Sequence, residues 1–305
     1  MSNHGNGEAE PGAQMDDRLK QVESYIGRMP SLSTTVAKVL DICNRPDTSP
    51  NDLNRVIALD PVLTGKVLHL INSAYYSLPD EVTSLTRAII VLGVNTVKNL
   101  ALSTAILEAL GNGGNNKALS MDEFWTHSIG VGVIAKSLAA MRGIPAIRRE
   151  EYFVAGLLHD LGKIPLNGVF PDDYCRVMAL LEEGAAESST AAEERVLGLN
   201  HGRIGVLIAD KWKQTEAMRE VMRCHHDPSA AKDEWRLMVT IVSLADDCDH
   251  LFRQRGSQDL SSGDLQIVRL REETGMDAPA IAALRDAVSD EIERAKIFLS
   301  IAGKA

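Results

Sequence analysis

Apolar residues recur at helical spacing along most of the chain, and several of these stretches begin at recognisable capping residues. Ser49 and Asp60 each precede a proline, so we expect each to cap a helix whose first residue is that proline. Ser84 is a third candidate cap, and Gly93 is expected to end the helix that follows it. The sequence shows no strand-like series of alternating apolar and polar residues and no internal repeat. The pattern therefore predicts an all-α fold.

A run of glycine and asparagine gives the strongest boundary signal and divides the chain into two helical parts. We expect an N-terminal helical subdomain at residues 16–110, a linker at 111–119, and a second helical subdomain at 120–254 packed against the first. Residues 1–15 are polar and rich in glycine, which is typical of a disordered tail. Residues 255–305 are expected to form a helical extension, either a dimerising pair of helices or a lid on the core.

Composition and charge limit the classes of function. The chain has 305 residues, of which 45% are hydrophobic and only 4% aromatic, so two aliphatic helical cores are expected. The formal net charge of −10 disfavours a nucleic-acid partner, because such binding depends on counterion release by cationic side chains. No apolar stretch approaches the length of a membrane span, and no charged-then-apolar leader begins the sequence. We therefore expect a cytoplasmic protein with no membrane partner.

Histidines are concentrated in the second half of the chain. Six of the eight lie between His127 and His250, and they include the His225–His226 pair and the His159–Asp160 step. Neutral imidazoles and carboxylates are the ligands that divalent transition metals use in proteins. The clustering therefore indicates a candidate metal site in this half of the chain.

The His159–Asp160 step ends an apolar helical stretch at residues 152–158. A buried histidine hydrogen-bonded to an aspartate would produce the same dipeptide, so the step alone suits a metal ligand and a core pair equally well. Asp246 lies in another apolar run, where a buried carboxylate needs a hydrogen-bonding partner or a metal ion. Considered together, these segments favour the metal site.

Several motifs carry a resemblance to a known family. The order and spacing of the histidines and aspartates resemble the HD superfamily of metal-dependent phosphohydrolases. The fuller resemblance is to the HDOD domain, a regulatory branch of that superfamily, and it covers about residues 20–253. The segments that carry it are residues 29–33, 60–63, 72–76, 88–93, 124–128, 158–163 and 225–228.

The resemblance implies two sets of metal ligands. The first set matches the core HD ligands and consists of His127, His159, Asp160 and Asp246. The second set matches the additional histidines by which the related HD-GYP phosphodiesterases hold a second ion, and consists of His201, His225 and His226. In this arrangement Asp160 bridges two divalent ions. Such a His-rich set with a bridging carboxylate suits iron or manganese, with zinc as the alternative.

Three further residues are candidates for the site. Glu123 lies one helical turn before His127, where some HD-GYP members carry an additional metal ligand, but it also suits a capping box with Ser120. Lys163 and Arg203 are candidate phosphate contacts, although a solvated lysine at a helix end explains Lys163 equally well. Solvated or outer groups, rather than ligands, are expected at Asp247, Asp249 and His250.

The chain departs from the HD-GYP pattern after the His225–His226 pair. Residues 227–232 stand where that group has a glutamate and the Gly-Tyr-Pro loop that shapes its cyclic dinucleotide site, and no Gly-Tyr-Pro follows later. The resemblance therefore does not imply hydrolysis of cyclic di-GMP.

Two functions from different classes fit these observations. The first is a bacterial signal-transduction or regulatory module that binds a dinuclear metal site in its HD-like half and acts through a signalling protein partner. The second is a metal-dependent phosphohydrolase that acts on a nucleotide or another phosphoester. Both use the same ligands and allow a small phosphate-containing ligand, so the sequence does not separate them. The missing loop and the regulatory character of the family favour the first.

Overall fold

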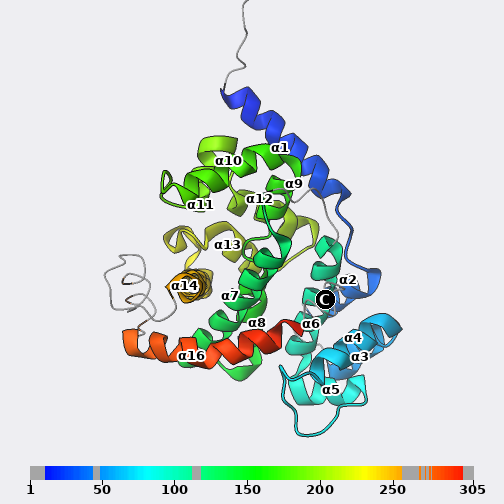
Figure 1. Cartoon of the computed structure of the whole chain (residues 1–305). Helices are drawn as coiled ribbons and strands as arrows, with labels where there is room; N and C mark the ends of the chain where they lie inside the picture. Colours follow the sequence, from blue (N-terminus) through cyan, green and yellow to red (C-terminus); the bar gives the residue numbers. More distant parts are fainter. Residues whose placement is uncertain are drawn as a thin grey trace, which may run out of the picture.

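The computed structural model describes residues 11–43, 49–111, 118–255 and 277–297, and in addition residues 268, 272 and 275. The first part of the chain forms α1 (Pro11–Arg28), α2 (Thr34–Cys43), α3 (Pro50–Ile57), α4 (Pro61–Ile71), α5 (Leu85–Leu92) and α6 (Val94–Gly111). Of these helices, α2 to α6 gather at the lower right of Figure 1, and α1 extends along the upper right.

The second part of the chain contains the remaining helices, among them α7 and α14, the two longest in the described part of the chain. They are α7 (Met121–Met141), α8 (Ala146–Leu158), α9 (Lys163–Val169), α10 (Pro171–Glu182), α11 (Ser189–Leu197), α12 (His201–Lys211), α13 (Glu216–Cys224), the short 3-10 helix η1 (Pro228–Ala230), α14 (Asp233–Arg255) and α16 (Ala278–Ala295). Helix α7 packs against α8, α14 and α16 and forms the centre of this part.

The predicted helix starts are confirmed at the level of hydrogen bonds. Ser49 and Asp52 form a complete capping box, in which each side chain accepts the backbone N–H group of the other residue. The side chains of Asp60 and Ser84 accept N–H groups from the first turns of α4 and α5. Gly93 ends α5 with φ at 85°, a conformation that glycine adopts without steric cost.

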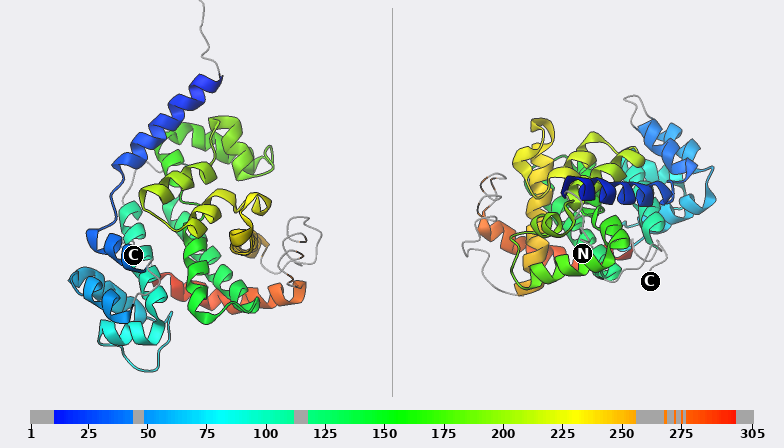
Figure 2. Two further views of the ribbon diagram at one scale, coloured as in Figure 1. Left: turned by 180° about the vertical axis from the view of Figure 1, so that it is seen from behind. Right: turned by 90° about the horizontal axis from the view of Figure 1, so that it is seen from above.

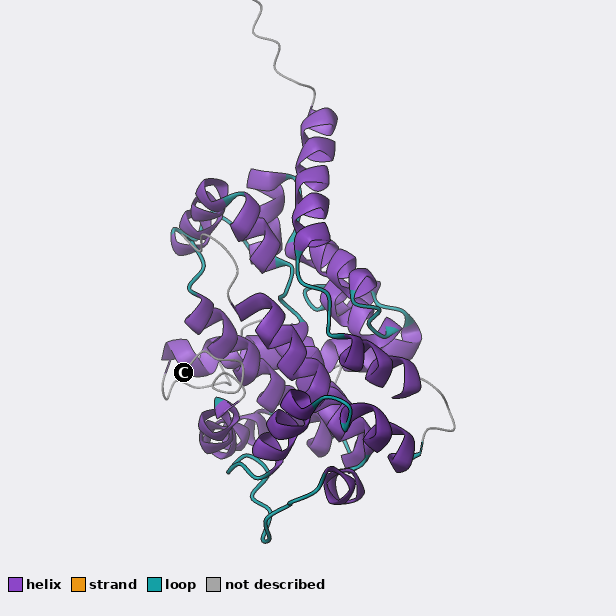
Figure 3. Ribbon diagram, turned by 90° about the vertical axis from the view of Figure 1, so that its right-hand side faces the viewer, coloured by secondary structure: helices purple, strands orange, loops and turns teal. Residues whose placement is uncertain are grey.

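The fold class is also confirmed. Every regular element in the described ranges is a helix, and Figure 3 contains no strand among them. None of these helices is by itself long and apolar enough to cross a bilayer.

Helices α7 and α8 approach each other closely at two glycines. A Cβ atom added to Gly156 would lie 2.8 Å from the Cα atom of Gly132, and one added to Gly132 would lie 2.8 Å from the carbonyl oxygen of Phe153. The backbones therefore touch at this crossing, and α8, which ends at Leu158, is held in a fixed position relative to α7. This contact positions the His159–Asp160 step that follows α8.

The two halves of the chain meet through α6 and through the segment after α4. Helix α6 packs against α8. The hydroxyl of Tyr75 accepts a hydrogen bond from the ammonium group of Lys136 on α7 at 3.0 Å, and Lys136 also pairs with Glu150 on α8 at 2.6 Å. A polar contact thus joins the N-terminal half to both central helices of the second half.

Helix α1 lies mainly against the second half of the chain. It packs on α9 and α12, and Figure 2 shows it crossing that part when seen from above. The ammonium group of Lys211, at the end of α12, donates to the carbonyl groups of Ile26, Gly27 and Met29, which lie at or just after the end of α1. Three acceptors on one cation explain why the end of α1 is fixed at this place.

The structure refines the predicted ends of the chain. Helix α1 begins at Pro11, inside the expected tail of residues 1–15, because proline is preorganised for the first position of a helix. Residues 1–10, and residues 112–117 of the predicted linker, lie outside the described residues. Of the predicted extension at 255–305, α16 packs against α7, and most of the remainder lies outside the described residues.

Candidate metal centre

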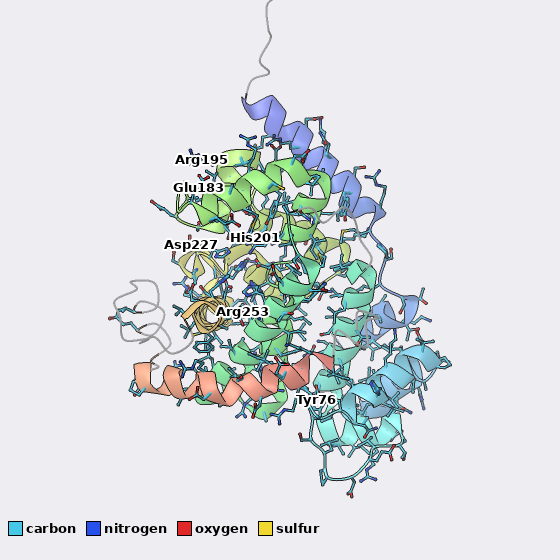
Figure 4. All side chains as sticks on the ribbon, viewed as in Figure 1. Tyr76, Glu183, Arg195, His201, Asp227 and Arg253 are labelled. Atoms are coloured by element: carbon cyan, nitrogen blue, oxygen red, sulfur yellow. The ribbon has the colours of Figure 1, made fainter. Side chains whose placement is uncertain are left out.

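The structure brings the seven predicted ligands together from five helices. Helix α7 carries His127, the end of α8 leads into His159 and Asp160, and α12 begins at His201. The end of α13 supplies His225 and His226, and α14 supplies Asp246. Figure 4 places His201 inside the helical bundle, away from the labelled Glu183 and Arg195 at its upper edge.

Asp160 lies at the centre of this cluster, and its two carboxylate oxygens face different histidines. Oδ1 is 3.2 Å from Nε2 of His201 and 3.5 Å from Nε2 of His225. Oδ2 is 3.4 Å from Nε2 of His159 and 3.8 Å from Nε2 of His127. The carboxylate is therefore divided between two groups of histidines.

The potential ligand atoms form overlapping sets in which all atoms lie within 4.8 Å of one another. One set consists of Asp160, His201, His225 and His226. The others consist of His127, His159 and Asp160; of His159, His225 and Asp246; and of His127, Asp246 and His250. Asp160 is shared between a set on the α12–α13 side and a set on the α7–α8 side.

Four of the histidines are oriented by a partner on Nδ1, which leaves Nε2 pointing into the cluster. Each of these Nδ1 atoms lies 2.6 to 3.0 Å from an acceptor oxygen, so each donates its proton there. The pairs are His159 with the Gly156 carbonyl, His225 with the Val221 carbonyl, His201 with Glu193, and His127 with Asp249. Metal-binding histidines have this arrangement, because it fixes the tautomer and the direction of the lone pair.

Several atoms that face the centre are buried and have no hydrogen-bond partner. They are Nε2 of His127 and of His159, and Oδ1 of Asp160 and of Asp246. Buried polar atoms are almost always paired, and a group of unpaired atoms that converge on one place requires an explanation. Each of these atoms belongs to at least one of the ligand sets, where a divalent cation would give it a partner, so the residues present fit metal binding.

The electrostatics suit the same ligands. Burial raises the pKa of Asp160, but the neighbouring His159, Lys163 and His201 outweigh it and hold that pKa well below its usual range. Burial lowers the pKa of His226 well below its usual value, and nearby His225 lowers it further. The aspartate is therefore ionised and this histidine neutral, as metal ligation requires.

His127 differs from the other histidines. Burial lowers its pKa, but the neighbouring carboxylates of Asp246 and Asp249, at 3.2 and 2.7 Å, outweigh this effect and raise the pKa to about 9. With no cation present its imidazole carries a proton between two carboxylates, so a metal ion at this position must displace that proton.

Lys163 is paired with the central carboxylate. Its ammonium nitrogen lies 2.5 Å from Oδ2 of Asp160, and its side chain is only 16% exposed. Burial lowers the pKa of Lys163, but Asp160, Asp246 and Glu193 outweigh this effect and raise it. The structure thus places Lys163 at the cluster, where the sequence left open a solvated lysine.

Glu193 on α11 contributes to the cluster without having been predicted from the sequence. Its carboxylate is fully buried and accepts hydrogen bonds from the backbone N–H and from Nδ1 of His201, both at 2.7 Å. The hydroxyl of Tyr174 donates to its other oxygen at 2.9 Å. Helical spacing could have predicted that Glu193 is buried. It lies one turn before the buried Leu197 and therefore on the inner face of α11.

The remaining candidates lie farther from the centre. Glu123 is exposed in the first turn of α7, where its N–H donates to Ser120, and it belongs to none of the ligand sets. Arg203 is exposed and lies two residues after His201, a spacing that directs side chains to different faces of a helix. His250, expected as an outer group, reaches the edge of the cluster, with Nε2 at 3.4 Å from Oδ1 of Asp246.

Comparison with protein families and known proteins agrees with this geometry. The HDOD domain model matches residues 29–228, about two thirds of the chain. An uncharacterized protein of Treponema pallidum (strain Nichols) is 24% identical over 227 residues. The match covers 73% of this chain and 42% of that protein, so the chain spans less than half the length of this curated relative.

Solved structures with the same fold span nearly the whole chain. An HDOD domain protein of unknown function from Geobacter sulfurreducens is 26% identical, with a TM-score of 0.72 and coverage of 94% of this chain and 98% of its own. A candidate phosphohydrolase from Shewanella amazonensis SB2B is 22% identical, with a TM-score of 0.71 and coverage of 92% and 98%.

A candidate signal transduction protein from Marinobacter aquaeolei VT8 is 22% identical, with a TM-score of 0.72 and coverage of 97% of this chain and 67% of its own. For the two structures that are 22% identical to this chain, the likeness shows the fold alone. The family assignment rests on the domain match, which agrees with the helical architecture and with the cluster of histidines and aspartates. The chain belongs to the HDOD family.

Proposed function

We propose that this protein is a cytoplasmic regulatory module of bacterial signal transduction whose HD-like half binds two divalent metal ions. The observation that carries the proposal is the division of the Asp160 carboxylate between two groups of histidines. If only one ion were bound, the two oxygens of Asp160 would not need to face two separate groups of imidazoles whose Nε2 atoms point into the cluster.

The ligands divide between the two positions. His201, His225 and His226 would hold one ion together with Asp160, and His127, His159 and Asp246 would hold the other. Mixed imidazole and carboxylate ligation of this kind suits iron or manganese, with zinc as the alternative.

Burial favours binding and regulation over turnover. His159, Asp160, His201 and His225 are each at most 1% exposed, so most of the centre is closed to a substrate. The side chain of His250, 56% exposed, marks the accessible edge. The contact of Lys136 with Tyr75 links this half to the N-terminal half, through which a signal to a partner protein could pass.

Lys163 supports a second candidate function, a metal-dependent phosphohydrolase. A dinuclear centre supplies a polarised phosphoryl oxygen and a bound water of lowered pKa. The ammonium group of Lys163 is within reach of a phosphate placed at Asp160, and it would neutralise and orient that phosphate. Two structural neighbours from Shewanella amazonensis SB2B are described as candidate phosphohydrolases, one of them as metal-dependent.

Elemental analysis of protein purified without chelators tests the proposal. We expect about two equivalents of iron, manganese or zinc per chain, and a large loss in the Asp160→Asn variant. Asp122→Asn is the matched control, because Asp122 is exposed in the first turn of α7. Protein that stays metal-free after reconstitution with each ion would rule out both candidate functions.

Activity assays then separate the two functions. The metal-loaded protein is incubated with bis(p-nitrophenyl) phosphate and with cyclic dinucleotides. Hydrolysis that is lost in Asp160→Asn and retained in Asp122→Asn would establish the phosphohydrolase. Full metal loading without hydrolysis of any phosphoester would favour the regulatory module.

A further inference from the structure

A separate cavity of about 220 Å³ lies where α6 meets the second half of the chain. It is bounded by α6, α8, α14, the turn before α13 and the first turn of α13. Helix α13 begins at this cavity and ends at Cys224, directly before His225, and its nine residues span about 13 Å. The cavity is therefore distinct from the candidate metal centre.

Positive charge is concentrated around the cavity. Lys98 on α6, Arg148 on α8 and Lys213 in the turn before α13 line it, together with one acid, Glu151. The acid pairs with Arg148 at 3.6 Å. Among the described residues, neither lysine side chain has an ion pair or hydrogen bond with another. In a chain with a net charge of −10, two unpaired ammonium groups at one cavity favour an anion from solution.

The start of α13 adds backbone donors. Thr215 caps this helix, and its hydroxyl accepts the N–H group of Met218. The N–H groups of Glu216 and Ala217 have no acceptor within the helix, and Ala217 lines the cavity. The positive end of the helix dipole points the same way, which favours a negative group at this position.

Asn99 contributes a polar group to the cavity wall that is independent of the lysines. This residue lines the cavity from α6 and is only 3% exposed. Its amide nitrogen is buried without a hydrogen-bond partner in the described part of the protein. Buried amide groups are rarely left unpaired, and an oxygen atom of a bound anion would provide the acceptor.

Part of the cavity wall is apolar. Trp235 on α14 lines the cavity and is half-buried, and Leu102, Met218 and Met238 surround the same space. An aromatic side chain beside cationic groups suits a ligand with a flat apolar part and a charged end.

We propose that this cavity binds a small organic anion, in which a flat apolar group contacts Trp235 and a phosphate or carboxylate contacts Lys98, Lys213 and the start of α13. The site joins α6 of the N-terminal half to α8, α13 and α14. A ligand bound there would connect the two halves of the chain.

Titration with phenyl phosphate tests this site. Binding is measured by calorimetry and by the change in tryptophan fluorescence. We expect saturable binding with a dissociation constant below about 1 mM. The Lys98→Gln/Lys213→Gln variant should weaken binding at least about tenfold, since it removes two charge-assisted contacts. Lys20→Gln/Lys38→Gln is the matched control, because both of these lysines are exposed on other helices, and it should bind like the unmodified protein.

Two further variants locate the ligand. Trp235→Phe should abolish the fluorescence change, because Trp125 and Trp212 are buried elsewhere. Asp160→Asn should leave the binding of phenyl phosphate unchanged. Tighter binding of phenyl phosphate than of benzoate would identify the anion as a phosphate, and the reverse would identify a carboxylate; either result supports the site.

Three outcomes would overturn the proposal. They are the absence of saturable binding to either probe, equal binding by the Lys98→Gln/Lys213→Gln variant, and binding that is lost in Asp160→Asn but retained in that lysine variant. The last outcome would place the ligand at the metal centre. Circular dichroism and thermal unfolding of each variant exclude misfolding as the cause of a loss.

Discussion

The carboxylate of Glu193 holds the imidazole of His201 by its Nδ1 atom at 2.7 Å, and the same oxygen accepts the backbone N–H group of His201 at 2.7 Å. Two bonds from one oxygen fix both the start of α12 and the direction of the ring. Nε2 of His201 consequently points at Asp160. Glu193 thus positions a candidate ligand from a helix that contributes none of the candidate ligands itself.

We therefore expect Glu193→Ala to weaken metal binding about 10- to 100-fold, the usual effect of removing an outer partner of a metal-binding histidine. Glu193→Gln should weaken it less, because the amide oxygen can still accept from His201. Metal affinity is measured by competition with a chromogenic chelator. Glu183→Gln serves as the control, since Glu183 is exposed at the end of α10. Equal affinity in Glu193→Ala and the unmodified protein would contradict this role.

The close crossing of α7 and α8 makes a second prediction. Gly156→Ala should lower the free energy of unfolding by about 1–3 kcal/mol, because the new methyl group would meet the backbone of Gly132 at 2.8 Å. Gly65→Ala on α4 is the contrasting change, since nothing lies within 4 Å of its added methyl group. It should stabilise the protein by about 0.5–1 kcal/mol through helix propensity. Urea unfolding measures both, and a neutral Gly156→Ala would show that the helices can separate without cost.

Glu220 provides a pH-dependent contribution to stability away from the metal centre. Its buried carboxylate accepts two hydrogen bonds from Arg223, at 3.0 and 2.8 Å, and one from the N–H group of Lys232 at 3.0 Å. The Arg223 hydrogen bonds, with the Lys232 N–H group and the charges of both residues, outweigh burial and lower the pKa of Glu220 below its ordinary value of 4.5. The stabilisation is therefore present above pH 4.5 and is lost as the pH falls through the lowered pKa.

Glu220→Gln should accordingly reduce the free energy of unfolding by about 1–2 kcal/mol at pH 7. The difference from the unmodified protein should shrink as the pH falls below 4.5. Chemical unfolding at a series of pH values measures it. Glu234→Gln, at an exposed position on α14, should have almost no effect at any pH. A difference that grows toward low pH would show the wrong sign and refute this account.

The pair of Lys136 and Glu150, which lies beside the contact between the two halves, gives the last prediction. Lys136 and Glu150 form a largely buried pair, and Lys136 also donates to Tyr75. A double-mutant cycle of Lys136→Met and Glu150→Leu should give a coupling energy of about 0.5–3 kcal/mol, because either single change leaves a buried group without its partner. The exposed pair of Arg87 and Asp80, at 3.6 Å, should give a coupling energy close to zero. Equal coupling energies for the two pairs would show that burial does not strengthen the interaction between Lys136 and Glu150.

Local chemistry was enough to predict many elements from the sequence. The caps at Ser49, Asp60 and Ser84 depend on hydrogen bonds that span three residues, so the short segment that contains each cap also determines it. His159 and Asp160 could be proposed as metal ligands because other histidine and aspartate motifs along the chain support the step, which by itself suits a core pair equally well.

Other features depended on contacts between distant segments. Glu193 and Glu194 are adjacent acids of the same type, and only the packing of α11 beside α12 makes the first a partner of His201 and leaves the second at the surface. His250 reaches the cluster because α14 lies beside α7. Such relationships are set by the positions of whole helices, which no local pattern encodes.

The sequence by itself determined the helices, their starts and the residue types available for metal binding, because these depend on hydrogen bonds and side-chain periodicity within a few turns of one helix. The tertiary structure alone decided that Asp160 divides its oxygens between two groups of histidines and that α6 closes a cationic cavity against α8 and α13. Both depend on how separate helices pack, and packing depends on the shape of the whole core.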